Sequence, residues 1–400
     1  MRFVRLVKWL VKPESGRELI GKNHKHWWQV FGNVTILELS TGEKFLCTIY
    51  ALCDISYSKP LIVLSMNNNE TIPTIRTPVE LLDAIPPLIG FTPADSLVAV
   101  VVKNKLIYVT ARLDIAACET REGVQWLAER LTHGPDGKKL AGIGVFLVGY
   151  SERSRAQQAV LAMCEALGAL TKEALVVDGD FWWRIDEKLD TPGHKLPRKG
   201  RMSRILSQDN PVMASREELA RSIAAPTGKK EDEMLDAVMM SLDLIPEEDP
   251  PLAGQRIVAV MDQWSHGRPI TDEEYLSAVM TVSMGPARDE IWKILTKAKA
   301  EEYLPFWKQA MTRTPKGVRT AALAVTGIMA WIAGEGALMN ICLEEAEATD
   351  PEYPLVEMLN QISLGGLPPS YWDKLNPTLQ EKPPFSQQDP LVASEALTSV

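Results

Sequence analysis

The sequence predicts an α/β domain, with a mixed sheet and flanking helices, followed by an all-α, TPR-like region of helical hairpins. Continuous apolar runs such as LVAVVV and GIGVFLVGY are typical of strands that are covered on both faces. Helical patterns alternate with these runs, which indicates β-α-β passages. From Ser215 onward only helical patterns follow.

We expect five segments. They are an N-terminal extension over 1–65, the α/β domain over 66–190, a basic linker over 191–213, the helical domain over 214–375 and a disordered tail over 376–400. The stretch MNNNETIPTIRTP has the composition of a polar N-terminus ahead of the first predicted helix, so Met66 is the start that we expect for the natural protein. The first 65 residues are then either an over-extended reading frame or a separate small β-rich addition. His24, His26, Cys47 and Cys53 lie in this extension, but their spacing does not match a known zinc site.

Composition sets limits on the class of protein. The chain of 400 residues has 46% hydrophobic and 24% charged residues, as in ordinary soluble domains. Its nearest approach to a membrane span, Thr320 to Gly334, is too short and is better explained as a buried helix. The five cysteines are scattered and no secretion signal is recognisable, which favours a reducing cytoplasm.

Charge argues against nucleic acid as a partner. The net charge is -9, although the first 65 residues are net positive. One basic loop could bind phosphate, but it has no interleaved aromatic residue and a solvated linker is the commoner explanation. Its basic residues are Lys195, Arg198, Lys199, Arg201 and Arg204.

The α/β elements follow in order from Thr77, which caps a helix with Glu80 in a capping box. We expect Pro86 and Pro87 to end this helix. The turn GFTPADS then sets the entry into the strand LVAVVV, with Asp95 and Ser96 bonding turn amides. A short connection leads into the return strand LIYVTARLDI.

The return strand has a period of two. It places Tyr108, Thr110, Arg112 and Asp114 on one face and Ile107, Val109, Ala111 and Leu113 on the other. Arg112 and Asp114 can hold a polar ligand, or they can form a structural salt bridge.

Later signals complete the outline. We expect a helix near 122–131, a capping box from Ser154 and Gln157, and a strand-turn-strand at ALVVDGDFWWRI. In the helical half, capping boxes are predicted at Ser215/Glu218 and Thr271/Glu274. Buried helix faces there include Leu235, Val238 and Leu242. The stretch GEGALMNICLEEAEATDPEYPLVEML is similar to half of a tetratricopeptide unit, with a new helix at Asp350-Pro351.

Several ordered blocks resemble a known family. TPVELLDAIPPLIGFTPADSLVAVVV, YVTARLDI, ALVVDGDFWWRI, VMASREELARSIA and FWKQAMTRTP resemble domain-of-unknown-function family 4192 (DUF4192), which is found in actinobacteria and their phages. The resemblance covers roughly Thr74 to Trp372. It implies an architecture but no reaction.

Two functions are consistent with the sequence. The first is a cytoplasmic protein-binding or adaptor module, because helical hairpins, acidic charge and the lack of a recognisable catalytic motif favour it. The alternative is an enzyme or small-molecule binder with a polar pocket at the strand ends. Asp95 and Asp114 would be its catalytic candidates, and its ligand-binding residues would be Ser96, Arg112, Tyr150, Asp178, Trp182 and Trp183. No cofactor or metal is predicted.

Overall fold

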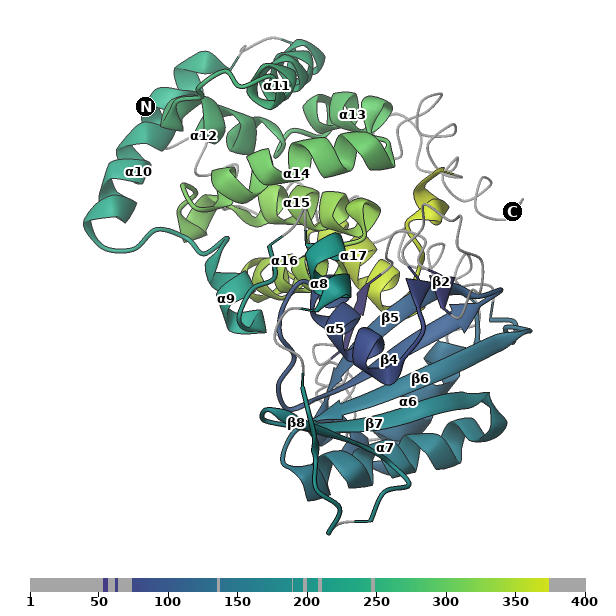
Figure 1. Ribbon diagram of the computed structural model, residues 1–400. Coiled ribbons are helices and arrows are strands. Elements are labelled where there is room, and N and C mark those ends of the chain that lie inside the picture. Colours follow the sequence, from purple (N-terminus) through teal and green to yellow (C-terminus); the bar gives the residue numbers. More distant parts are fainter. Residues whose placement is uncertain are drawn as a thin grey trace, which may run out of the picture.

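A computed structural model of the protein describes residues 53–56, 62–63, 74–134, 137–188, 190–196, 200–207, 211–245 and 249–373. Within these ranges an α/β half lies beneath a helical half (Figure 1). The predicted fold class, an α/β region with a mixed sheet followed by helices, is confirmed.

Nine strands of the described residues form one sheet. They are β1 Cys53–Ser56, β2 Ile62–Val63, β3 Thr74–Ile75, β4 Ser96–Lys103, β5 Leu106–Asp114, β6 Ile143–Tyr150, β7 Thr171–Asp178, β8 Phe181–Arg184 and β9 His194–Lys195. The order is β3-β2-β5-β4-β6-β7-β8-β9, and β1 pairs with β5. The sheet is mixed because β6 and β7 are parallel, whereas β4 is antiparallel to both β5 and β6.

The two faces of the sheet have different cover. Helices α6 (Arg121–Thr132) and α7 (Arg153–Leu167) cover the outer face, where Leu97, Ala99 and Val101 point. The inner face carries Val98 and Val100 and shares one continuous core with the helical half. Alternation along β4 therefore fills two cores from one strand.

A β-bulge corrects part of the predicted alternation. Val101 pairs with Val109 and Val102 with Ile107, so the register shifts at Tyr108. The prediction was right for Val109, but it was wrong for Ile107, which packs in the inner core, and for Tyr108, which packs against the outer core.

Helix α5 (Pro78–Ile89) continues through Pro86 and Pro87 instead of ending before them. Since Pro87 has no N–H, the helix leaves the carbonyl of Asp83 without its usual partner. The hydroxyl of Ser203 donates to that carbonyl at 2.8 Å. A residue more than a hundred positions away thus compensates for the proline.

The Asp83 carboxylate also holds the start of a helix that is distant in the chain, α8 (Arg201–Leu206). It is buried, and it accepts from the backbone amides of Gly200, Met202 and Ser203 at 2.7, 2.7 and 3.0 Å. A Cβ on Gly200 would lie 2.4 Å from its Oδ2 atom, so the approach requires glycine.

The segment predicted as a basic linker therefore contains structure, namely β9 and α8. Lys195 lies exposed on β9, Arg201 faces Glu80 at 3.4 Å, and Arg204 is exposed on α8. Arg198 and Lys199 lie outside the described residues.

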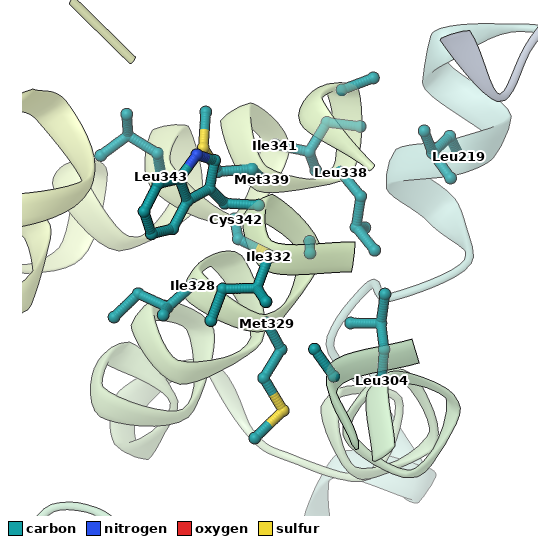
Figure 2. Packing of buried hydrophobic residues seen from close by; sticks show 14 of the residues in the cluster. Leu219, Leu304, Ile328, Met329, Ile332, Leu338, Met339, Ile341, Cys342 and Leu343 are labelled. Atoms are coloured by element: carbon teal, nitrogen blue, oxygen red, sulfur yellow. The ribbon is translucent and has the colours of Figure 1, made fainter. Parts of the chain in front are cut away.

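The helical half begins with α9. Its helices are α9 Arg216–Arg221, α10 Lys229–Ser241, α11 Pro250–Ser265, α12 Asp272–Thr281, α13 Gly285–Ile294, α14 Lys297–Met311, α15 Thr320–Ala333, α16 Gly336–Thr349 and α17 Pro354–Gly365. Helix α15 is buried over nearly its whole length, as predicted for Thr320 to Gly334. Figure 2 shows Leu219 of α9 and Leu304 of α14 beside the side chains of α15 and α16.

Helix starts test the capping predictions. The Thr271/Glu274 box is complete. Thr77 and Ser215 each accept from the predicted amide, but their glutamates accept from the residue before the cap. The Ser154/Gln157 box was wrong, because Glu152 caps α7. The helix expected at Asp350-Pro351 begins instead at Pro354.

Helix α9 is held on α16 by charge. Arg216 makes two contacts with the Glu344 carboxylate, at 2.7 and 3.2 Å. The buried Arg319 donates to the carbonyl of Ile223 and faces Glu345 at 3.3 Å. Leu219 and Ile223 belong to the inner core, so these ion pairs hold α9 and the residues after it against that core.

The N-terminal extension contributes β1 and β2, which pair with β5. The rest of its structure, and the tail predicted to be disordered, lie outside the described residues. The start at Met66 and the tetratricopeptide-like character stay predictions. Among the described residues, no helix is both long and apolar enough to cross a membrane.

We predict that Asp83→Ala lowers the free energy of unfolding by about 2–4 kcal/mol, because three amides at the start of α8 lose their buried acceptor. Urea unfolding would measure the change. Asp83→Asn keeps one acceptor oxygen and should lose less. A change below about 0.5 kcal/mol for Asp83→Ala would contradict this role.

Candidate functional site

The predicted site residues gather at one end of the sheet. Asp114 pairs with Ser96, and Ser96 pairs with Tyr150 on its other side. Tyr150 pairs with Val177, which pairs with Trp182. This register places Asp114, Ser96, Tyr150 and Trp182 in one row across the strands, which we call the inner row.

Alternation nevertheless divides the eight candidates between the two faces. Tyr150 and Trp182 belong to the inner core, and Arg112 and its partners Ser96 and Asp114 share that face. Asp95, Asp178 and Trp183 lie one position off the row and contact the start of α7 on the outer face. The sheet lies between the two groups. The binding role of each group stays a prediction.

On the inner face, Arg112 is the centre of a polar network. Its Nε donates to Ser96 Oγ at 2.7 Å, its guanidinium pairs with the Asp114 carboxylate, and it lies 6.0 Å from the ring centre of Phe91. The Arg112 side chain is 9% exposed and that of Asp114 is 31% exposed. A charge buried this deeply requires a partner, so this pair has the geometry of the structural salt bridge that the sequence allowed.

Glu217 of α9 extends this network towards solvent. The Ser215 hydroxyl, the backbone amide of Glu217 and the nearby Arg112 guanidinium hold the pKa of Glu217 below its ordinary value. The Arg112 guanidinium therefore interacts with two carboxylates, that of Asp114 in the sheet and that of Glu217 in the helical half.

Two aromatic side chains of the inner row carry unsatisfied polar atoms. Tyr150 Oη and Trp182 Nε1 are buried and have no hydrogen-bond partner among the described residues. Burial raises the pKa of the Tyr150 phenol, which therefore stays protonated. Trp182 packs against His194, with ring centres 4.6 Å apart. An unpaired buried polar atom costs about 1–3 kcal/mol, so a ligand that bonded these two atoms would be favoured.

On the outer face, Asp95 has a left-handed φ of 42°. Its carboxylate accepts from Ser151 Oγ at 2.6 Å and lies 3.6 Å from Arg155. Ser96 donates to the carbonyl of Ala94 at 2.5 Å. The expected bonds from Asp95 and Ser96 to turn amides are replaced by these contacts, although the turn does set the entry into β4.

Arg153 organises the rest of this group. Its guanidinium lies 4.2 Å from the Trp183 ring centre and donates to the carbonyls of Lys188 and Thr191. Asp178 accepts from the Arg153 amide at 3.1 Å and so satisfies the first N–H group of α7. Asp178 therefore fixes the start of α7, whereas Trp183 fixes the loop after β8 through its Nε1, which donates to the Thr191 carbonyl at 2.9 Å.

Other chemically active groups lie in the helical half. Tyr303 donates to Asp262, and Lys299 Nζ lies 2.9 Å from the same carboxylate. Burial and the bond to Asp262 raise the pKa of Tyr303 to about 12. A phenol held so firmly protonated is a poor base at neutral pH. The geometry of Tyr303, Asp262 and Lys299 therefore favours a structural role over a catalytic one. Within the described ranges, no group of three or more His, Cys, Asp and Glu side chains could hold a metal.

One surface was not predicted as a site. Leu235 was expected on the buried face of α10, but it is 46% exposed, and Met239 and Met240 are 41% and 62% exposed. The opposite face packs Met234 and Val238 against α12. We call Leu235, Met239 and Met240 the exposed face of α10. The signal in the sequence was the presence of apolar residues all round this helix.

The fold defines a class of protein: an α/β half with a mixed sheet, joined to a helical half by a shared core. The chain belongs to the family described as domain of unknown function (DUF4192), which matches residues 78–370. The resemblance in the sequence is thereby confirmed. No curated protein and no solved structure significantly matches the chain.

A buried carboxyl group in α13 allows a test of the helical half. Asp289 is 3% exposed and its Oδ1 atom has no hydrogen-bond partner among the described residues. Burial raises its pKa from 3.8 to about 6. Since the folded state binds this proton more tightly than the unfolded state, folding stability falls as pH rises between about 4 and 6.

We predict that Asp289→Asn stabilises the protein at neutral pH by about 1–2 kcal/mol, after allowance for solvent screening. The gain should be small near pH 4 and constant above about pH 6. Urea unfolding at several pH values would measure it. Glu290→Gln is the control, because Glu290 already pairs with Lys293 at 2.6 Å. A gain that is independent of pH would show that ionisation of Asp289 is not the cause.

Proposed function

We propose that the protein is a protein-binding module and that the exposed face of α10 is its docking surface. The observation that carries this proposal is the exposure of three large apolar side chains on one helix. Isolated exposed apolar residues are ordinary, whereas neighbours on one helix face are typical of interaction surfaces. Methionine suits such a surface, because its flexible side chain adapts to a partner.

The contacts of α10 support this role. Met234, Ala237 and Val238 pack with Leu276 and Met280 of α12 in a small cluster separate from the main core. This contact already positions the helix, so the folding of the helical half leaves Leu235, Met239 and Met240 uncovered. Helix α10 also lies at the periphery, at the end of the helical half far from the sheet (Figure 1).

The setting that we propose follows from the sequence. The family resemblance favours an actinobacterium or one of its phages as the source. Scattered cysteines favour the cytoplasm. In this setting the tetratricopeptide-like hairpins would support a binding surface without supplying a catalytic group.

A small-molecule function is the second candidate, and the unpaired atoms Tyr150 Oη and Trp182 Nε1 favour it. A ligand with acceptor oxygens would satisfy both donors of the inner row. The ion pair between Arg112 and Asp114 argues against a strongly anionic ligand, because the guanidinium already has a carboxylate partner.

We predict that Tyr150→Phe stabilises the ligand-free protein by about 1–3 kcal/mol, because it removes a buried hydroxyl that has no partner among the described residues. Native mass spectrometry of gently purified wild type and variant would then test the second candidate. A small-molecule mass carried by the wild type and lost in Tyr150→Phe would support it. Neither protein carrying such a mass would favour the docking function.

For the docking function, we predict that a triple variant, Leu235→Ser, Met239→Ser and Met240→Ser, loses the partner while its thermal stability stays nearly unchanged. Quantitative mass spectrometry of proteins retained on wild-type and variant chains, from the native host, would measure the loss. Leu161→Ser is the matched control, because Leu161 is 43% exposed on α7. A partner that is retained equally by all three chains would overturn α10 as the docking surface.

A further inference from the structure

The exposed face of α10 carries a line of negative charge between its apolar side chains. Asp232 and Asp236 are one turn apart, and Asp243 follows the end of the helix. Met239 and Met240 are three and four residues after Asp236, so at helical spacing they lie one turn further along the helix, on either side of Asp236. Apolar and acidic groups therefore share one surface.

These three aspartates are available to a partner. Each is exposed, and none of them forms an ion pair with any residue in the part of the chain that the structure describes. Of the two lysines at the start of α10, Lys229 pairs with Glu233 at 3.3 Å, and Lys230 forms no ion pair with these aspartates. The charge on this face is thus left without internal compensation.

We infer that the exposed face of α10 binds a cationic amphipathic helix of a partner protein, with Lys or Arg opposite the aspartates and apolar residues opposite Leu235, Met239 and Met240. This inference rests on the proposed docking function and names the chemistry of its partner. Complementary charge steers association and rejects wrong partners, while the apolar contacts supply most of the affinity. The carbonyl end of α10 adds partial negative charge close to Asp243.

A second copy of the chain does not fit the same surface. A symmetric pair uses one patch twice, so an antiparallel pairing of α10 with itself would bring the aspartate line of one copy against that of the other. Like charges that face each other across an interface are destabilising. Charge therefore selects a basic partner over self-association.

The probes for the test are three synthetic helical peptides with leucine at the same positions. Their polar positions are all lysine, all glutamine or all glutamate. Fluorescence anisotropy would measure binding of each labelled peptide to the full chain at increasing salt. We expect the lysine peptide to bind most tightly and its affinity to fall with salt, because the contacts are exposed ion pairs.

Variants separate this surface from general acidity. Replacing Asp232, Asp236 and Asp243 by Asn should weaken binding of the lysine peptide roughly tenfold or more. The matched control replaces Glu122, Glu129 and Glu165 by Gln. These residues are exposed on α6 and α7, so the control changes the net charge equally. It should leave the affinity within about twofold.

Three other outcomes would each contradict one of these claims. Equal weakening by both sets of variants would overturn the inference, because net charge alone would then explain binding. Tight binding of the glutamine or glutamate peptide that depends on Leu235, Met239 and Met240 would leave α10 as the docking surface and overturn the cationic partner. Binding that is unaffected by the apolar variant would overturn the proposed docking function itself.

Discussion

The burial of the inner face of the sheet is the constraint on which the rest of the structure depends. Strands β4, β5 and β6 turn this face towards the helical half, and one core runs from Val98 and Val148 to α15 and α16. Polar groups on this face must therefore find partners inside the protein. Arg112 finds Ser96 and Asp114, whereas Tyr150 Oη finds none among the described residues.

The same constraint explains how distant segments of the chain are held together. Asp83 reaches the amides that begin α8, and Ser203 returns a hydrogen bond to the carbonyl that Pro87 leaves open. The ion pair between Arg216 and Glu344 fixes α9 over the sheet. What reads as a linker in the sequence is thus part of the junction between the halves, while α10 lies at the periphery and remains available for a partner.

Sequence patterns predicted the parts that depend on local interactions. The apolar runs gave β4 and β6, and Thr271 with Glu274 gave the start of α12. The patterns failed where a distant residue decides. Ser203 allows α5 to continue past Pro87, and the bulge at Tyr108 places the Ile107 side chain on the face of the sheet opposite to the predicted one. The eight candidate site residues do lie near one end of the sheet, but alternation divides them between two faces. The exposure of Leu235 depends on which side of α10 meets α12, and this is invisible in a single helical pattern.

Native-state hydrogen exchange of the full chain tests most directly whether the inner face joins the two halves into one folding unit. If it does, the slowest amides of β4 and β6 and those of α15 and α16 open with free energies within about 1 kcal/mol of each other. Destabilising the junction at Arg216 should then lower both sets together. If the helical amides exchange through a clearly less costly opening while the strands stay protected, the shared core does not couple the halves and the account is wrong.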